Sequence, residues 1–138
     1  MREPDFANQK TLIVGSSDLS HYYPVEKANQ LDKIALKDIG EFDEQKLFTD
    51  VNSNRCQACG SGPILAAMIT SKKLGAEHSK IISYGTSGDY SKDYNSVVGY
   101  LSSVFYSIRA SECTLSVWEA DFRSFLGISD NCPATSHN

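Results

Sequence analysis

The fold of this chain depends most on the stretch Lys10-Thr11-Leu12-Ile13-Val14-Gly15-Ser16-Ser17-Asp18-Leu19-Ser20-His21-Tyr22, where an apolar run leads directly into a dense polar cluster. The first part, Lys10–Ser16, is short, apolar and β-branched, which predicts a buried strand. In open α/β sheets, ligands bind at the carboxyl ends of strands. Asp and His side chains can hold a metal or move a proton. The polar cluster therefore predicts a functional site.

The rest of the chain predicts further helices and strands around that site. Pro24 suits the first turn of a helix, and apolar residues follow helical spacing as far as Ile39, with Asp32 on the polar face. The same patterns predict helices over 43–51 and 63–74, strands over 80–84 and 97–106, and a polar turn over 86–96. We expect an α/β fold with a small, mainly β-α-β sheet flanked by helices.

Length predicts one main domain, because 138 residues suit a single core. We place that domain at residues 1–109 and an extra tail at 110–138, with one predicted helix over 112–126 and a frayed end. A sheet of so few strands leaves edges and faces exposed. We therefore expect a homo-oligomer, or a separate chain that supplies missing structure.

Charge and hydropathy exclude several classes of partner. The net charge of −4 argues against binding to nucleic acid or to anionic membranes, both of which favour a basic surface. No apolar run approaches the ~20 residues that cross a bilayer, and no signal-peptide core follows the first residues. We expect a cytoplasmic protein without nucleic-acid or membrane partners.

Cysteine spacing leaves three interpretations open for Cys59. Cys56 and Cys59 form one CxxC pair without a second, and the 3 histidines are scattered, which disfavours a structural zinc site. Cys59 precedes a Gly-Ser-Gly turn and a predicted helix, whose backbone N–H groups favour a thiolate. That thiolate could ligate a metal or form a redox pair with Cys56. The third interpretation is a small buried hydrophobic residue.

Two interpretations also remain for Asp18 and His21. At their spacing both side chains can face one side, so Asp18 could fix the tautomer of His21, which then acts as a base or a metal ligand. Alternatively, Asp18 and Ser20 cap the following helix and His21 is a surface residue. A serine hydrolase is disfavoured, because the G-x-S-x-G pattern is absent.

Several segments together resemble the Memo family, known in bacteria and archaea as AmmeMemoRadiSam system protein B. They are Val14–Tyr22, Ala58–Ile64, Tyr84–Asp89 and Val97–Tyr100, in the order and at about the spacing of the family. The resemblance covers roughly residues 10–107. It implies a fold similar to class III extradiol (LigB-like) dioxygenases. Family members are longer, and this chain resembles their C-terminal half.

The resemblance also implies a metal site that this chain carries in part. Family members line a metal-binding vestibule with histidines of their N-terminal half, together with positions that match His21 and Cys59. We therefore expect His21 and Cys59 as ligands of iron or copper, Asp18 and His21 as the catalytic pair, and Ser16 and Ser17 as cofactor contacts. Two matched ligands are fewer than the three that a catalytic metal usually takes from protein. The expected function is a partial metal or small-ligand site without an assigned reaction. The alternative is a non-catalytic interaction or oligomerisation module.

Overall fold

The computed structural model describes residues 12–108. The chain divides into two units, Met1–Tyr106 and Ser107–Asn138, and almost all described residues belong to the first. Lys10, Thr11 and the predicted tail with its helix over 112–126 lie outside the described residues. In chain order the elements are β1 (His21–Tyr23), α1 (Val25–Gly40), α2 (Glu44–Asn52), α3 (Ser61–Lys73), β2 (His78–Thr86), α4 (Gly88–Ser91) and β3 (Val97–Tyr106). The α/β class is confirmed.

The three-stranded sheet has the order β1-β3-β2 and both neighbouring pairs are antiparallel; helices α1–α3 connect β1 to β2, as in a β-α-β unit, but β3 lies between these two strands. β2 and β3 pair from Thr86 opposite Gly99 to His78 opposite Tyr106, with an irregularity between Ile81 and Ser83. The segment between these strands contains only the short helix α4. A parallel pair needs a crossover of a dozen or more residues, usually with a longer helix, so this short connection favours antiparallel neighbours.

The strand predicted over Lys10–Ser16 is also wrong for its described part, because residues 12–19 contain no strand. The strand begins later, at His21, and pairs with Val98 and Val97. Leu12 and Val14 are instead largely exposed. Strand propensity is realised only where a neighbouring strand and a buried face are present, and the segment finds neither in the described part of the chain.

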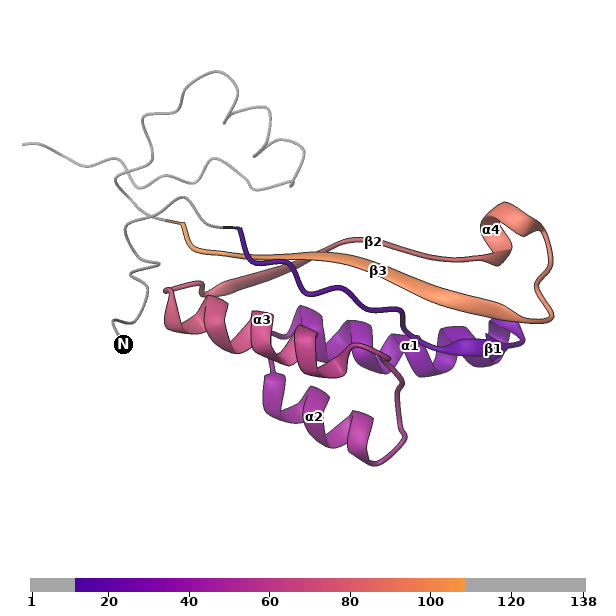
Figure 1. Cartoon of the computed structure of the whole chain (residues 1–138), viewed down its shortest axis with the longest axis horizontal. Coiled ribbons are helices and arrows are strands. Elements are labelled where there is room, and N and C mark those ends of the chain that lie inside the picture. The colour runs from indigo at the N-terminus through magenta and orange to yellow at the C-terminus, as the bar shows by residue number, and fades with distance from the viewer. Residues whose placement is uncertain (1–11, 109–138) are drawn as a thin grey trace, which may run out of the picture. The chain divides into compact units, whose positions relative to one another are not determined.

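The three predicted helices are confirmed as α1, α2 and α3, and they lie on one side of the sheet. α1 packs against β2 and β3, whereas α2 packs against α1 and α3 farther from the sheet (Figure 1). The core between these layers contains Leu19, Ile39, Leu47 and Met68. The ring of Phe42 also packs there and stacks on the ring of Phe105, with 4.6 Å between the ring centroids. Within residues 12–108, no helix combines the length and apolar composition needed to cross a membrane.

Asp32 is buried, which corrects its predicted place on the polar face of α1. One carboxylate oxygen accepts a hydrogen bond from the backbone N–H of Ser20 at 3.0 Å, and the other accepts one from the hydroxyl of Tyr84 at 2.8 Å. A buried carboxylate is tolerated when it is hydrogen-bonded in this way. Asp32 thereby ties α1 to β2 and to the backbone that leads into His21.

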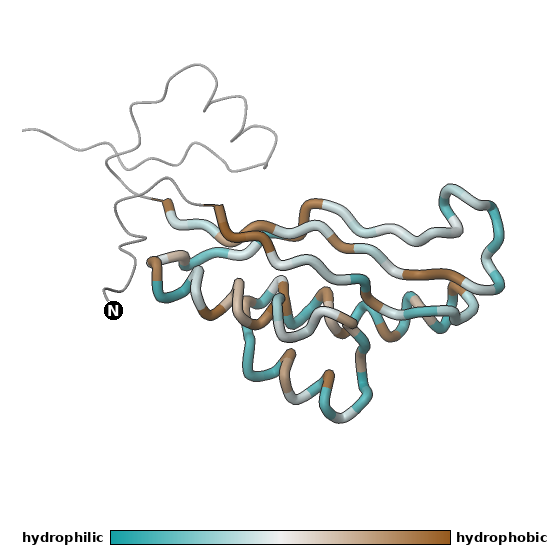
Figure 2. The backbone as a smooth tube through the Cα atoms, in the orientation of Figure 1, coloured by the Kyte–Doolittle hydropathy of each residue, from teal (hydrophilic) through white to brown (hydrophobic). Residues whose placement is uncertain are grey.

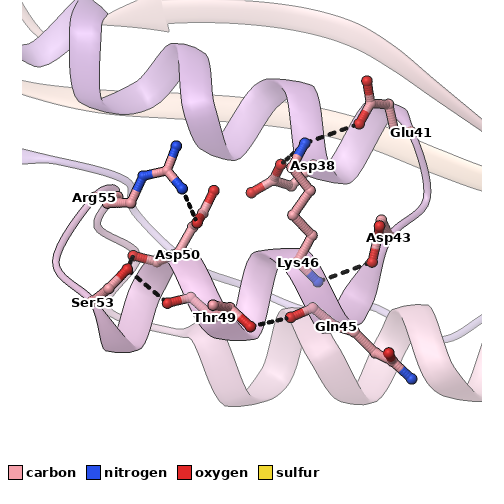
Figure 3. Close-up of polar contacts among 9 residues, drawn as sticks. All are labelled: Asp38, Glu41, Asp43, Gln45, Lys46, Thr49, Asp50, Ser53 and Arg55. Atoms are coloured by element: carbon pink, nitrogen blue, oxygen red, sulfur yellow. Dashed lines mark hydrogen bonds and ion pairs between the residues drawn. The ribbon is translucent and has the colours of Figure 1, made fainter.

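Two further carboxylates are buried, Asp38 on α1 and Asp50 on α2, and the pair of Asp38 with Lys46 joins the two helices (Figure 3). Asp38 lies 3.1 Å from the Lys46 ammonium, and Asp50 accepts a hydrogen bond from Arg55 at 2.9 Å. Burial raises the pKa of Asp38, and Lys46 opposes this rise. The interface between the two helices is therefore polar as well as apolar.

Candidate functional site

The side chains of Asp18, His21 and Cys59 converge although they are distant along the chain. One potential ligand atom from each residue lies within 4.8 Å of the other two. Nε2 of His21 is 3.6 Å from a carboxylate oxygen of Asp18, and both side chains are partly exposed. Cys59 is an exposed free thiol. An imidazole, a carboxylate and a thiol thus meet at the molecular surface.

Reciprocal hydrogen bonds hold the two loops of this site together. The N–H of Cys59 donates to the carbonyl of Asp18 at 3.1 Å, and the N–H of Asp18 donates to Sγ of Cys59 at 3.4 Å. Next to this pair, the N–H of Gly60 donates to Oγ of Ser17 at 2.8 Å. Asp18 therefore contributes to the site through both its backbone and its side chain.

Gly60 is required by the close approach of these loops. A Cβ atom at this position would lie 2.4 Å from the carbonyl oxygen of Ser16 and 2.8 Å from Cβ of Ser17. Gly15 meets Pro63 in the same way, with a would-be Cβ 2.8 Å from the Pro63 oxygen. The sequence predicted a turn at Gly60 and assigned no packing role to Gly15 or Gly60. Their packing role becomes visible only when the two loops are placed side by side.

His21 is positioned by β1, where it pairs with Val98. The next residue, Tyr22, has a φ of 61°, and the register of β1 shifts between His21 and Tyr23. Such bulges redirect side chains and often occur next to functional sites. This irregularity was not predictable from the sequence, because nothing in the residue pattern of β1 indicates a tyrosine with a positive φ.

The helix-capping alternative for Asp18 and Ser20 is wrong. The N-cap of α1 is Pro24, and no side chain caps this helix. Asp18 faces His21 instead, and Ser20 is fully buried. Their polar side chains therefore need another explanation, and the cluster with His21 and Cys59 supplies one for Asp18.

The two predicted cofactor contacts lie beside Cys59 but differ in their roles. Oγ of Ser17 donates to the carbonyl of Asp18 at 2.7 Å and lies 3.8 Å from Sγ of Cys59. Ser16 lies against Gly60 through its backbone oxygen. Ser17 therefore helps to join the loops. A cofactor contact by either serine stays a prediction.

Cys56 and Cys59 occupy different environments. Cys56 is buried in the core, and burial, with a further contribution from Asp38 and Asp50, raises its thiol pKa to about 11. At neutral pH this thiol is protonated, so it is a poor nucleophile and a poor ligand. Cys56 fits the small buried hydrophobic residue, whereas Cys59 faces the site. This difference disfavours the redox-pair interpretation.

Comparison with known proteins assigns the family. The sequence profile described as "Memo-like protein" matches residues 2–104. The chain belongs to the Memo family. It is 52% identical over 93 residues to a MEMO1 family protein of Methanococcus vannielii, which covers 67% of this chain and 33% of that relative. A MEMO1 family protein of Methanocaldococcus jannaschii is 44% identical over 97 residues, covering 70% of this chain and 34% of the relative.

The resemblance inferred from the sequence motifs is therefore confirmed at the level of the family. This Memo family chain spans about a third of the length of the curated relatives that it matches. No solved structure matches it. The similarity to LigB-like dioxygenases stays a prediction.

Proposed function

We propose that this chain carries a partial metal site of the Memo family. In this proposal His21 and Cys59 are ligands, and Asp18 orients His21 or serves as a further ligand. The observation that carries the proposal is the convergence of the three ligand atoms within 4.8 Å of one another. Around a metal with bonds of 2.0–2.3 Å, ligand atoms lie about 3.5 Å apart, so small side-chain adjustments bring these three to bonding distance.

The donor chemistry fits iron or copper, since imidazole and thiolate are ligands that both metals accept. The N–H of Asp18 donates a hydrogen bond to Sγ of Cys59, and such contacts to a ligand atom orient it and tune the metal. A bound iron or copper would supply Lewis-acid or redox chemistry. His21 could also move a proton, with Asp18 as its partner, because the two groups face each other.

The proposed site is incomplete within one chain. Three donors leave coordination positions for water, for a small ligand or for a residue of another chain. The partial exposure of Asp18 and His21 supports access from outside. We assign no reaction to this site, and the pair of Asp18 and His21 remains the candidate for catalysis.

Metal binding by the purified protein tests the proposal. We expect the protein in reducing buffer to bind Fe(II) or Cu(I) at one site, measured by elemental analysis and by competition with a chromophoric chelator. His21→Ala and Cys59→Ser should each weaken binding at least ~10-fold, as expected for lost ligands. His78→Ala is the matched control, because His78 is exposed and lies outside the cluster. Equal affinity in all four proteins would overturn the proposal.

A second candidate function is an interaction module without catalysis. It is favoured by the exposed apolar surface of Leu12 and Val14, which precede Asp18 in the chain. The two candidates differ in metal content. Absence of metal binding, together with a protein complex that depends on this surface, would favour the interaction module.

A further inference from the structure

Asp38 of α1 and Asp50 of α2 form a buried pair of carboxyl groups that lies outside the proposed metal site. Asp38 is 0% exposed and Asp50 is 2% exposed. The two side chains face each other (Figure 3), and the structure gives a hydrogen bond between them. Two ionised carboxylates only accept hydrogen bonds, so this contact requires a proton on one of them. We call these two residues the carboxyl pair.

Two cations contact the carboxyl pair, and neither is dedicated to it. The Lys46 ammonium lies 3.1 Å from Oδ1 of Asp38, but it is also 3.1 Å from a carboxylate oxygen of Glu41. Arg55 donates to Oδ1 of Asp50 at 2.9 Å, and its side chain is 62% exposed. Solvent screens an exposed cation. These two cations therefore compensate the carboxyl pair only in part.

The other groups around the carboxyl pair carry no charge. Burial raises the thiol pKa of Cys56 to about 11, so this neighbour stays neutral. On the side of the sheet, the hydroxyl of Ser79 donates to the carbonyl of Ile39, the residue after Asp38. Within residues 12–108, Oδ2 of Asp38 and Oδ2 of Asp50 have no hydrogen bond to a group outside the pair. Each aspartate is therefore the other's remaining partner.

Burial without a full set of donors favours the neutral form of a carboxyl group, and like charges at close range do the same. We propose that the carboxyl pair shares one proton at pH values where a free aspartate has lost its own, and that this proton is a pH-sensitive latch between α1 and the connection 53–60. With the proton, one carboxyl group donates to the other and the pair carries one negative charge. When the proton leaves to solvent, two facing negative charges remain and the pair separates.

The latch acts on the connection between α2 and α3. The backbone carbonyl of Asp50 accepts hydrogen bonds from the N–H groups of Arg55 at 2.9 Å and Cys56 at 3.3 Å. The same connection contains Cys59, whose N–H bonds to the carbonyl of Asp18 at 3.1 Å. Movement of Asp50 therefore loosens the segment that leads to the candidate site. The shared proton requires no metal, so this inference does not rest on the proposed function.

The pH dependence of unfolding tests the shared proton. The native state keeps a proton that the unfolded state loses near pH 4, so the equilibrium constant for unfolding should rise by up to about tenfold per pH unit above that value, until the pair ionises. In urea denaturation at a series of pH values, Asp38→Asn and Asp50→Asn should each remove most of this rise, because an amide donates to the remaining carboxylate. Asp93→Asn, at an exposed aspartate, is the matched control and should keep the slope of the parent.

Two outcomes of this experiment would overturn the proposal. The first is the slope of the parent in both Asn variants. The second is its loss in Asp38→Asn alone, which would assign the proton to one residue.

A measurement on the parent protein covers variants that fail to fold. With ¹³C-labelled aspartate, the carboxyl carbons of Asp38 and Asp50 should respond to the same titration step, at higher pH than exposed aspartates. Independent titrations of the two carbons, or titration of both together with exposed aspartates, would overturn the sharing of a proton.

Hydrogen exchange tests the latch itself. Protection of the Arg55 and Cys56 amides, relative to their intrinsic rates at each pH, should fall at least ~10-fold as the pair ionises. Amides of β3 that bond to β2 are the internal control and should keep their protection. In Asp38→Asn, protection of the Arg55 and Cys56 amides should stay constant over the same pH range. An equal loss of protection in β3, or none at Arg55 and Cys56, would rule out a local latch.

Discussion

Gly99→Ala tests the packing that places the site on the sheet. A Cβ atom at this position would lie 1.9 Å from one carboxylate oxygen of Asp32 and 2.8 Å from its Cγ. Asp32 is fully buried, so its carboxylate has no route to solvent. The Asp32 carboxylate also accepts a hydrogen bond from the N–H of Ser20 at 3.0 Å and one from the hydroxyl of Tyr84 at 2.8 Å. The substitution must therefore displace a group that joins α1 to β2 and to the segment before β1.

The expected loss in the free energy of unfolding for Gly99→Ala follows from these two hydrogen bonds. A hydrogen bond to a charged group contributes about 1.5–3 kcal/mol, so losing both costs about 3–6 kcal/mol. A small domain has a free energy of unfolding of about 5–15 kcal/mol, so the loss is a large fraction of the total. Tyr84→Phe removes only one of the two bonds and should cost about half as much. Burial and the contact with Asp32 raise the pKa of Tyr84, so its hydroxyl stays protonated and donates across the neutral range.

Urea denaturation followed by far-ultraviolet circular dichroism measures these changes in the free energy of unfolding. Gly62→Ala is the matched control, because no atom lies within 4 Å of its would-be Cβ. Gly62 is the second residue of α3 and directly precedes Pro63, so alanine there should change the free energy of unfolding by less than about 1 kcal/mol. A loss below about 1 kcal/mol in Gly99→Ala would refute the argument, since Asp32 would then have moved without losing its partners.

Three further predictions concern the site and the buried polar groups. Gly60→Ala places a Cβ atom 2.4 Å from the carbonyl oxygen of Ser16, so it should separate the two loops and weaken metal affinity at least ~10-fold in a chelator competition; unchanged affinity would contradict this. Burial raises the pKa of Asp38, so its contribution to stability is present below its unfolded pKa and is lost as the pH rises through its folded pKa. Asp38→Asn should therefore gain stability relative to the parent protein between pH about 4 and neutrality, and a constant difference across urea titrations would argue against it. Iodoacetamide should modify Cys59 in the native protein and Cys56 only after unfolding, because burial raises the thiol pKa of Cys56 to about 11; equal native rates in peptide mass spectra would exclude this.

Local patterns in the sequence predicted the helices well. The spacing of apolar residues in α1, and the turn glycines before α3, depend on interactions within a few residues. The same is true of the motifs around His21 and Cys59, which are two of the four segments that carry the family resemblance. Their chemistry was visible because the chain has only 3 histidines and 4 cysteines, and His21 and Cys59 lie next to predicted turns.

Strand pairing and burial were not predictable in this way. The apolar segment at Leu12–Val14 has strand propensity, but a strand forms only where another strand supplies hydrogen bonds. Asp32 matched the polar face of α1, yet it is buried because Tyr84 and Ser20, both distant in the sequence, satisfy its carboxylate.

By itself, the sequence determined the helices, the polar cluster that contains Asp18 and His21, and membership of the Memo family. Only the tertiary structure decided that the sheet is antiparallel and that Cys59 reaches His21 while Cys56 is buried. Helices and motifs arise from contacts between near neighbours, whereas strand pairing, burial and the meeting of two loops depend on how distant segments pack.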